Sequence, residues 1–324
     1  MASRIRAGPA DEVKARPRGG GVERLDEFLA AAQVSVVDVT RGAAAGTRRL
    51  RLGGSTSGPV SYVVAVADRL DAATAIATEA RLLAELGQRA SPSVLATLPR
   101  VVARVSVGDR PAVVMTALPQ ARPGRPLAPL DHAYLDAVGG WLEALWASTA
   151  GLPEPVGLGR EAADQLLARY CGSRQLAVAL GAVHRARLRV EGLRLRRTAV
   201  HGCLCPSHVQ VRDGAVTWVD DWGLAVASGE PLRDLGGFAV RIAGHRLPEL
   251  VADRTGPAHA VRDFVRTGLD VLEVPAGRWR DVLLLAQAER AVAALEYGRT
   301  DQVERLATAA DGLPPDSDDP EAAR

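Results

Sequence analysis

One segment in the second half of the chain restricts its fold more than any other feature. Residues 200–225 read VHGCLCPSHVQVRDGAVTWVDDWGLA: a short apolar approach, a His-Gly pair, a proline-bearing loop and two short apolar runs. The two runs flank an Asp-Gly pair, which is typical of a tight hairpin turn, and the second run ends in DDWG. The segment therefore predicts a loop, a β-hairpin and a pair of carboxylates in direct succession.

Composition excludes several classes of protein. The chain has 324 residues, of which 47% are hydrophobic and 24% charged, as in ordinary soluble globular proteins. It has no apolar run of membrane-spanning length, no signal-peptide core near its start and only three cysteines, so we expect a cytoplasmic protein without a membrane partner or a disulfide framework. A formal net charge of only +2 gives no field that would attract nucleic acid.

The first third of the chain is rich in predicted strands. Residues 1–21 contain Gly, Pro and charge without periodicity, which predicts a disordered leader. Residues 22–118 contain short apolar runs separated by turn clusters, interrupted by one stretch, AATAIATEARLLAEL, with the apolar spacing of a helix. We expect these residues to form a small β-rich lobe with one helix.

The remainder of the chain is mainly helical. Residues 119–130 form a Pro-rich connector, and residues 131–310 are predicted to form a large lobe whose helices include single long ones over 162–187 and 279–309. The acidic, Pro-rich residues 311–324 are expected to be a disordered tail. The fold class is therefore α+β, with two lobes.

The text of residues 200–225 resembles the aminoglycoside phosphotransferase and choline kinase-like family. In that family the corresponding text reads roughly HGDxxPxNVL, then a hairpin, then IDW or IDF. The resemblance implies a protein kinase-like fold, with a small lobe of antiparallel sheet plus one helix and a large lobe that carries a catalytic-loop hairpin. It also implies ATP, Mg²⁺ and transfer of a phosphoryl group to a hydroxyl.

The chain departs from the family's sequence motif at the catalytic and metal-binding positions. By the resemblance, Cys203 stands at the position of the catalytic Asp and His208 at that of a metal-binding Asn, whereas Asp221 keeps the second metal ligand. The remaining matches are to positions that the family uses for structure: His201, Pro206 and Asp234.

The cofactor side of the predicted site also departs from the family. The strand SYVVAVA places Ala65 at the position of the nucleotide-binding lysine, and Glu79 matches the helix glutamate that holds that lysine. An ordinary exposed helix glutamate is the alternative interpretation of Glu79. The phosphate loop would contain Gly42 and Gly46, for which a plain strand-to-strand turn is an equal alternative.

Another side chain has to replace the missing lysine if the predicted nucleotide site is to keep a positive charge. The only lysine in the chain is Lys14, in the leader, so an arginine (Arg49, Arg51 or Arg69) is the available cation. A guanidinium is a planar fork and not a compact ammonium, so this exchange is not conservative.

Three functions remain open from the sequence. The first is a pseudokinase that acts as a ligand-binding or regulatory module, with weakened ATP and Mg²⁺ binding and an unknown small-molecule or protein partner. The second is a divergent small-molecule phosphotransferase that uses Asp221, Asp220 and an arginine clamp. The third is a Zn²⁺ module whose ligands come from Cys203, Cys205, His208 and Asp221, with His201 as a further candidate.

Overall fold

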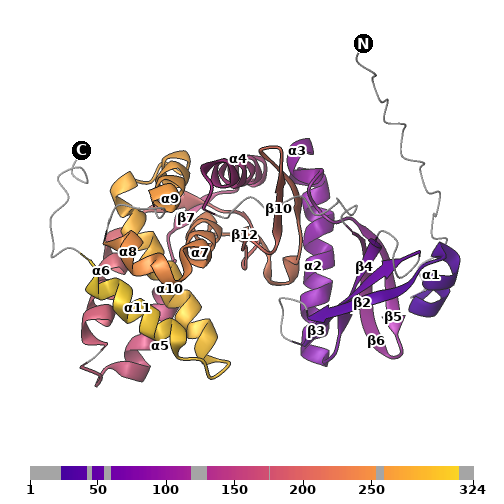
Figure 1. The fold of residues 1–324 in the computed structure, drawn as a ribbon, viewed down its shortest axis with the longest axis horizontal. Helices are drawn as coiled ribbons and strands as arrows, with labels where there is room; N and C mark the ends of the chain where they lie inside the picture. Colours follow the sequence, from indigo (N-terminus) through magenta and orange to yellow (C-terminus); the bar gives the residue numbers. More distant parts are fainter. Residues whose placement is uncertain are drawn as a thin grey trace, which may run out of the picture.

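The chain folds into two lobes that lie side by side (Figure 1). The computed structural model describes residues 23–41, 46–54, 60–117, 130–174, 176–252 and 259–313. The expected leader and most of the expected connector and tail lie outside these ranges. Across the described ranges, no helix has both the length and the apolar character needed to cross a membrane.

The small lobe is built on a six-stranded sheet in the order β1-β5-β6-β4-β3-β2. The pairings are antiparallel except for the short β1, which runs parallel to β5. In chain order the strands are β1 (Glu23–Arg24), β2 (Ser35–Arg41), β3 (Thr47–Gly53), β4 (Val60–Ala67), β5 (Val101–Val107) and β6 (Arg110–Thr116).

Both faces of this sheet are covered, which explains why β4 is continuously apolar from Val63 to Ala67. Side chains alternate between the two faces of a strand. Val64 and Val66 belong to one core with α1 (Leu25–Ala32), whereas Ala65 and Ala67 belong to a second core with α2 (Leu70–Arg89). The second core continues into the large lobe, so α2 is the structural link between the sheet and the helical lobe.

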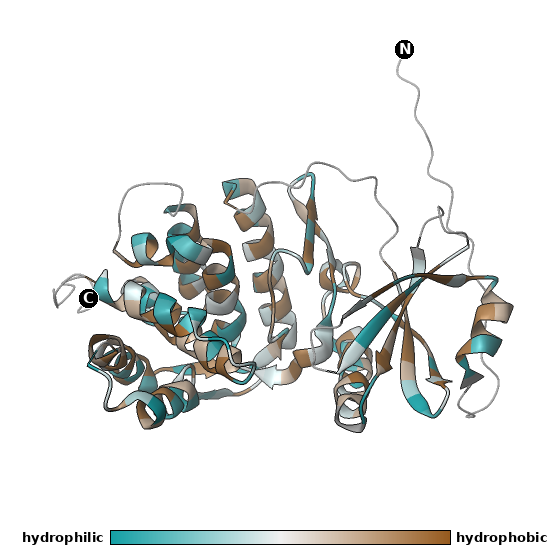
Figure 2. Cartoon of the chain, turned by 60° about the horizontal axis from the view of Figure 1, so that its bottom comes forward, coloured by the Kyte–Doolittle hydropathy of each residue, from teal (hydrophilic) through white to brown (hydrophobic). Residues whose placement is uncertain are grey.

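The large lobe contains helices and three small two-stranded sheets (Figures 1 and 2). Its strands are β7 (Pro153–Pro155), β8 (Arg194–Arg196), β9 (Thr198–Val200), β10 (Val209–Arg212), β11 (Ala215–Val219) and β12 (Val226–Gly229). Its helices are α4 (His132–Thr149), α5 (Arg160–Tyr170), α6 (Ala177–Glu191), α7 (Pro231–Ala243), α8 (Leu247–Val251), α9 (His259–Val271), α10 (Trp279–Leu295) and α11 (Asp301–Asp311). Three short 3₁₀ turns are η1 (Trp222–Leu224), η2 (Gly244–Arg246) and η3 (Ala276–Arg278).

Two of the helix predictions were wrong, because each predicted long helix is a pair. Helix 162–187 divides into α5 and α6 around Gly172, and helix 279–309 divides into α10 and α11 around Gly298, whose φ is +70°. Glycine adopts this left-handed conformation without a Cβ penalty, so it ends helices readily. Two further small-lobe helices, α1 and the short α3 (Pro92–Leu95), were not predicted; in the chain they come before and after the predicted small-lobe helix.

The hairpin predicted from residues 200–225 is present. β10 and β11 pair in antiparallel fashion, with Asp213 and Gly214 at the turn and both in positive-φ conformations. Trp222, in η1 directly after the hairpin, is fully buried and contacts the ring of Trp141 in α4 edge-on, at a centroid distance of 6.3 Å. This packing fixes the end of the hairpin against the core that the two lobes share.

Candidate functional site

The loop between β9 and β10 is held in place through its backbone. The buried carboxylate of Asp234, in α7, accepts hydrogen bonds from the amides of His201 (2.6 Å) and Gly202 (2.9 Å). Burial raises the pKa of Asp234 to about 6, although the two amides lower it. Gly202 has a φ of +81°, and a Cβ there would lie 2.4 Å from the carbonyl oxygen of Leu224. The loop therefore has one well-determined backbone path.

His201 is fully buried beneath this loop. Its Nε2 lies 2.7 Å from the carbonyl oxygen of Asp220, and its ring lies 4.7 Å from that of Trp222. Burial lowers the pKa of His201 to about 4, so the ring is neutral at neutral pH. A carbonyl only accepts, so Nε2 carries the proton and Nδ1 presents a lone pair.

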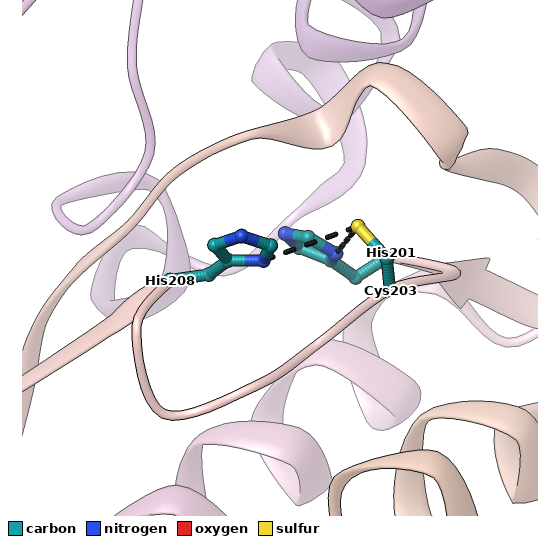
Figure 3. A group of neighbouring side chains, drawn as sticks. All are labelled: His201, Cys203 and His208. Atoms are coloured by element: carbon teal, nitrogen blue, oxygen red, sulfur yellow. Dashed lines mark hydrogen bonds between the residues drawn. The ribbon is translucent and has the colours of Figure 1, made fainter. Parts of the chain in front are cut away.

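Cys203 is directed toward that lone pair (Figure 3). Its Sγ lies 3.5 Å from Nδ1 of His201 and 3.9 Å from Nδ1 of His208. Burial raises the pKa of the Cys203 thiol, although the contact with His208 lowers it. The neutral thiol donates a hydrogen bond toward Nδ1 of His201 and keeps its proton. At this position the chain therefore presents a hydrogen-bond donor and not the carboxylate base that phosphoryl transfer uses.

His208 lies between the thiol and Asp221. Its Nδ1 faces Cys203, and its Nε2 lies 3.7 Å from Oδ2 of Asp221. Burial lowers the pKa of His208, but hydrogen bonding with the sulfurs of Cys203 and Cys205 outweighs it, and the net direction is upward. We call His201, Cys203 and His208 the thiol–imidazole cluster.

Cys205 and Pro206 lie at the margin of this cluster. The Sγ of Cys205 lies 3.0 Å from Oγ of Ser207. Burial raises the pKa of Cys205, but hydrogen bonds with His208 and Ser207 bring it down to about 7. Pro206 follows in the same loop and is half-buried, and its structural role stays a prediction.

A second cluster joins the two lobes. The Nη2 of Arg49, in β3, donates to Oε1 of Glu79 in α2 at 2.9 Å and to Oδ1 of Asp221 at 2.7 Å. The three side chains are 11%, 3% and 15% exposed, so solvent screens their charges only weakly. The backbone amide of Trp222 also donates to Glu79. We call Arg49, Glu79 and Asp221 the ion cluster.

Burial and charge oppose one another within the ion cluster. Burial alone would lower the pKa of Arg49, but the carboxylates of Glu79 and Asp221 raise it above its ordinary value. Burial raises the pKa of Glu79, although the Arg49 guanidinium lowers it. The guanidinium therefore stays charged and links the small-lobe helix to the end of the hairpin.

Strand register explains why Arg49 takes this position. Arg49 pairs with Ala65 across β3 and β4, so the two side chains share the face that looks toward α2. Ala65, at the predicted lysine position, is fully buried and small, which leaves space for the guanidinium from the neighbouring strand. The alternative that Glu79 is an exposed helix residue is wrong, since its side chain is buried against this cation.

The other two candidate arginines and the predicted phosphate loop lie elsewhere. Arg51 lines the cleft between the lobes, whereas Arg69 precedes α2 and lies beside Gly46. Gly42 lies outside the described residues. Gly46 has a φ of +73° in the turn before β3 and is not among the residues that line the cleft. A phosphate-binding role for this turn stays a prediction.

The cleft between the lobes has a volume of about 490 Å³. The small lobe contributes Arg51, Val63 and Met115 to its walls, together with Arg49 and Glu79 of the ion cluster. The large lobe contributes Ser207, His208, Asp220 and Asp221. Its size and its mixture of apolar and charged walls are those of a small-molecule site.

The residues present do not fit the Mg²⁺ site that the resemblance implies. Mg²⁺ requires hard oxygen ligands in octahedral geometry. Oδ1 of Asp221 is taken by Arg49, and the predicted amide ligand is the imidazole of His208, a poor magnesium ligand. The roles predicted for Asp221 and His208 as magnesium ligands are therefore not supported by the geometry.

Comparison with known proteins supports the fold. The sequence matches no protein-family model and no curated protein. Among solved structures, aminoglycoside 2'-phosphotransferase-IIIa with GDP is similar at a TM-score of 0.58 and 16% identity, over 89% of this chain and 96% of that one. Macrolide 2'-phosphotransferase MphH from Brachybacterium faecium is similar at a TM-score of 0.55 and 21% identity, over 90% of this chain and 99% of that one.

A third neighbour shows the same fold with ligands. A thermostable mutant of aminoglycoside phosphotransferase APH(4)-Ia, solved as a ternary complex with ADP and hygromycin B, has a TM-score of 0.54 and 17% identity, over 88% of this chain and 96% of that one. Identities this low establish architecture and leave chemistry to the site residues. The chain thus has the protein kinase-like fold of the aminoglycoside and macrolide phosphotransferases.

Proposed function

We propose that this chain is a pseudokinase: a kinase-like protein that binds an anionic, nucleotide-sized ligand in its interlobe cleft without Mg²⁺ and does not transfer phosphoryl groups. One observation carries the proposal. Both carboxylate oxygens of Asp221 face protein nitrogens, Oδ1 at 2.7 Å from Nη2 of Arg49 and Oδ2 at 3.7 Å from Nε2 of His208. The carboxylate that would hold the metal is already neutralised from within the chain.

The loss of a proton acceptor supports the same conclusion. Phosphoryl transfer depends on positioned charge and on a group that orients the attacking hydroxyl. The Cys203 thiol is buried and donates toward His201, so it cannot take up a proton from a substrate. Removal of a positioned base alone costs about 10²–10⁴ in rate, and the missing metal site adds to that loss.

The walls of the cleft indicate the class of ligand. Val63 and Met115 offer apolar contact, and Arg51 offers a guanidinium that forms no ion pair with any residue in the described ranges. A guanidinium binds phosphate through parallel hydrogen bonds. Structural neighbours of this fold were solved with ADP, AMP-PNP or GDP, so ATP and GTP are the first ligands to test.

Calorimetric titration of ATP and GTP, each with and without Mg²⁺, tests the proposal. We expect binding whose Kd changes less than about threefold on adding Mg²⁺, with no nucleotide-dependent phosphorylation of alcohols or of the chain itself. Arg51→Gln should weaken binding by roughly tenfold, because it removes one charge-assisted phosphate contact. Arg104→Gln, at an exposed position of β5, is the matched control and should bind as the unmodified chain does.

Two outcomes would overturn the proposal. Binding that tightens at least tenfold with Mg²⁺, together with turnover that Asp221→Asn abolishes, would establish the divergent phosphotransferase instead. Absence of nucleotide binding under both conditions would remove the ligand-binding function and leave the fold as a scaffold for a protein partner.

A further inference from the structure

The thiol–imidazole cluster brings three soft or borderline donor atoms to one point. His201, Cys203 and His208 each offer one ligand atom, and these three atoms all lie within 4.8 Å of one another. Figure 3 shows the three side chains next to one another, with dashed contacts from the sulfur of Cys203 to one nitrogen of each imidazole. We infer that this cluster is a binding site for a zinc ion, with two imidazoles and one thiolate as ligands.

The two sulfur–nitrogen separations fit tetrahedral zinc. Bonds of about 2.3 Å to sulfur and about 2.0–2.1 Å to nitrogen at tetrahedral angles place the sulfur about 3.6 Å from each nitrogen. The observed distances from Sγ of Cys203 are 3.5 Å to Nδ1 of His201 and 3.9 Å to Nδ1 of His208. Side-chain adjustments of a few tenths of an ångström bring both sulfur–nitrogen pairs to this value.

The far nitrogens of both imidazoles are held as they are in metal-binding histidines. A ligating histidine donates its other ring N–H to a carbonyl or a carboxylate, which fixes the tautomer. Nε2 of His201 donates to the carbonyl oxygen of Asp220 at 2.7 Å, so Nδ1 is the free donor atom. Nε2 of His208 lies 3.7 Å from Oδ2 of Asp221, which leaves its Nδ1 directed at the thiol.

The cluster is also rigid before any ion binds. The amide of His201 is fixed by Asp234, and its ring contacts those of Trp222 and His208, at centroid distances of 4.7 and 5.6 Å. His208 lines the interlobe cleft, so the fourth coordination position can be reached from there by water or by a ligand group. Three protein ligands with one open position is the arrangement of non-structural zinc sites.

The chemistry of the donors favours zinc over magnesium. Thiolate and imidazole select zinc, whereas magnesium requires oxygen. On binding, zinc forms bonds to the Cys203 sulfur and to Nδ1 of His201 and His208; the S–H bond of Cys203 and the Nδ1–H bond of His208 break, and both protons leave to solvent. The proposed ligand set differs from the one expected from the sequence. Cys205 contacts Ser207 and is not a ligand. Asp221 is not a ligand either, since its carboxylate faces Nε2 of His208 and supports that imidazole.

Zinc content and cobalt spectroscopy test this site independently of nucleotide binding. The full chain, purified without chelator, should hold about one zinc ion by elemental analysis. Replacement by Co²⁺ should give the charge-transfer absorption of a thiolate–cobalt bond and the visible bands of a tetrahedral ion. Cys203→Ala should lose that absorption, and His208→Gln should weaken zinc binding by roughly 100-fold in a chelator competition.

Matched variants separate ligation from misfolding. Cys205→Ser, in the same loop but outside the cluster, should keep full zinc content, and Asp221→Asn should weaken zinc binding about 10–100-fold through His208. The thermal midpoint of each variant is measured in excess chelator to establish folding. His208, on the cleft wall, is the substitution that disturbs the core least.

The inference is wrong if the folded unmodified chain binds no zinc at micromolar free metal, or if folded Cys203→Ala and His208→Gln retain zinc with unchanged affinity. Failure of the nucleotide titration leaves this test unaffected, since it uses the metal alone.

Discussion

The ion cluster and the thiol–imidazole cluster lie at the same cleft, yet they differ in how they depart from what phosphoryl transfer needs. In the ion cluster Ala65 stands where the resemblance places a lysine, and Arg49 on the adjacent strand supplies a cation on the same face. In the thiol–imidazole cluster Cys203 stands where the resemblance places a carboxylate, and the neighbours of the thiol are two imidazoles.

This difference shows that a positive charge and a proton acceptor do not tolerate a change of position equally well. A positive charge can be relocated between neighbouring strands, because register places cross-strand side chains about 5 Å apart on one face. A proton acceptor cannot be relocated so easily, since it has to be within hydrogen-bond distance of one substrate atom. The ion cluster therefore still holds a cation between two carboxylates, whereas the thiol–imidazole cluster presents a thiol and two imidazoles at the position where the resemblance implies a carboxylate base.

The largest expected effect tests whether the ion cluster is structural. Arg49→Met leaves Glu79 and Asp221 buried without their shared cation, and we expect a loss of about 3–5 kcal/mol in the free energy of unfolding. Arg51→Met removes a neighbouring arginine of the same strand face and should cost about 0.5–1 kcal/mol. Urea denaturation of both variants measures the difference. Equal losses would show that the ion cluster contributes no special stability.

The second effect tests whether the thiol–imidazole cluster depends on backbone geometry and not on charge. Gly202→Ala forces a side chain into a left-handed conformation and against the carbonyl of Leu224, so we expect a loss of about 3 kcal/mol or more. Gly214, at the hairpin turn, has a similar φ of +73° with no atom within 4 Å of a Cβ. Gly214→Ala should therefore cost only about 1–2 kcal/mol.

Thermal and chemical unfolding of the two glycine variants give this comparison directly. If Gly202→Ala is no more destabilising than Gly214→Ala, the loop does not have a single backbone path. The thiol–imidazole cluster would then be held by its side chains alone, which weakens the contrast with the ion cluster.

The smallest effect is a pH dependence within the ion cluster. Burial raises the pKa of Glu79, so the folded state binds its proton more tightly than the unfolded state. Its contribution to stability is therefore complete below the unfolded pKa and is lost as the pH rises through the folded pKa. Glu79→Gln keeps an acceptor for Arg49 but cannot ionise.

We expect the free energy of unfolding of the unmodified chain, relative to Glu79→Gln, to fall as the pH is raised from about 4.5 to 7. Denaturation curves at several pH values measure this slope. A relative stability that rises with pH would contradict this prediction. It would mean that the Arg49 guanidinium lowers the pKa of Glu79 by more than burial raises it.

The local elements around the site and the class of the fold follow from the amino-acid sequence alone. The Asp-Gly turn and the flanking apolar runs predict the β10–β11 hairpin, and the spacing of Ile76, Ala80 and Leu83 predicts α2; both are confirmed. These features depend on turn chemistry and on periodicity within a few residues. The sequence-based predictions failed at Gly172 and Gly298, because Ala- and Leu-rich segments lie on both sides of breaks that are only a few residues long.

Which residues form the two clusters becomes visible only in the folded structure. The sequence offered three arginines as the missing cation, and the pairing of Arg49 with Ala65 selects one of them. It offered four or five zinc ligands, and the loop held by Asp234 brings His201, Cys203 and His208 together and leaves Cys205 aside. Register and long-range hydrogen bonds join residues distant in sequence, so no local pattern specifies them.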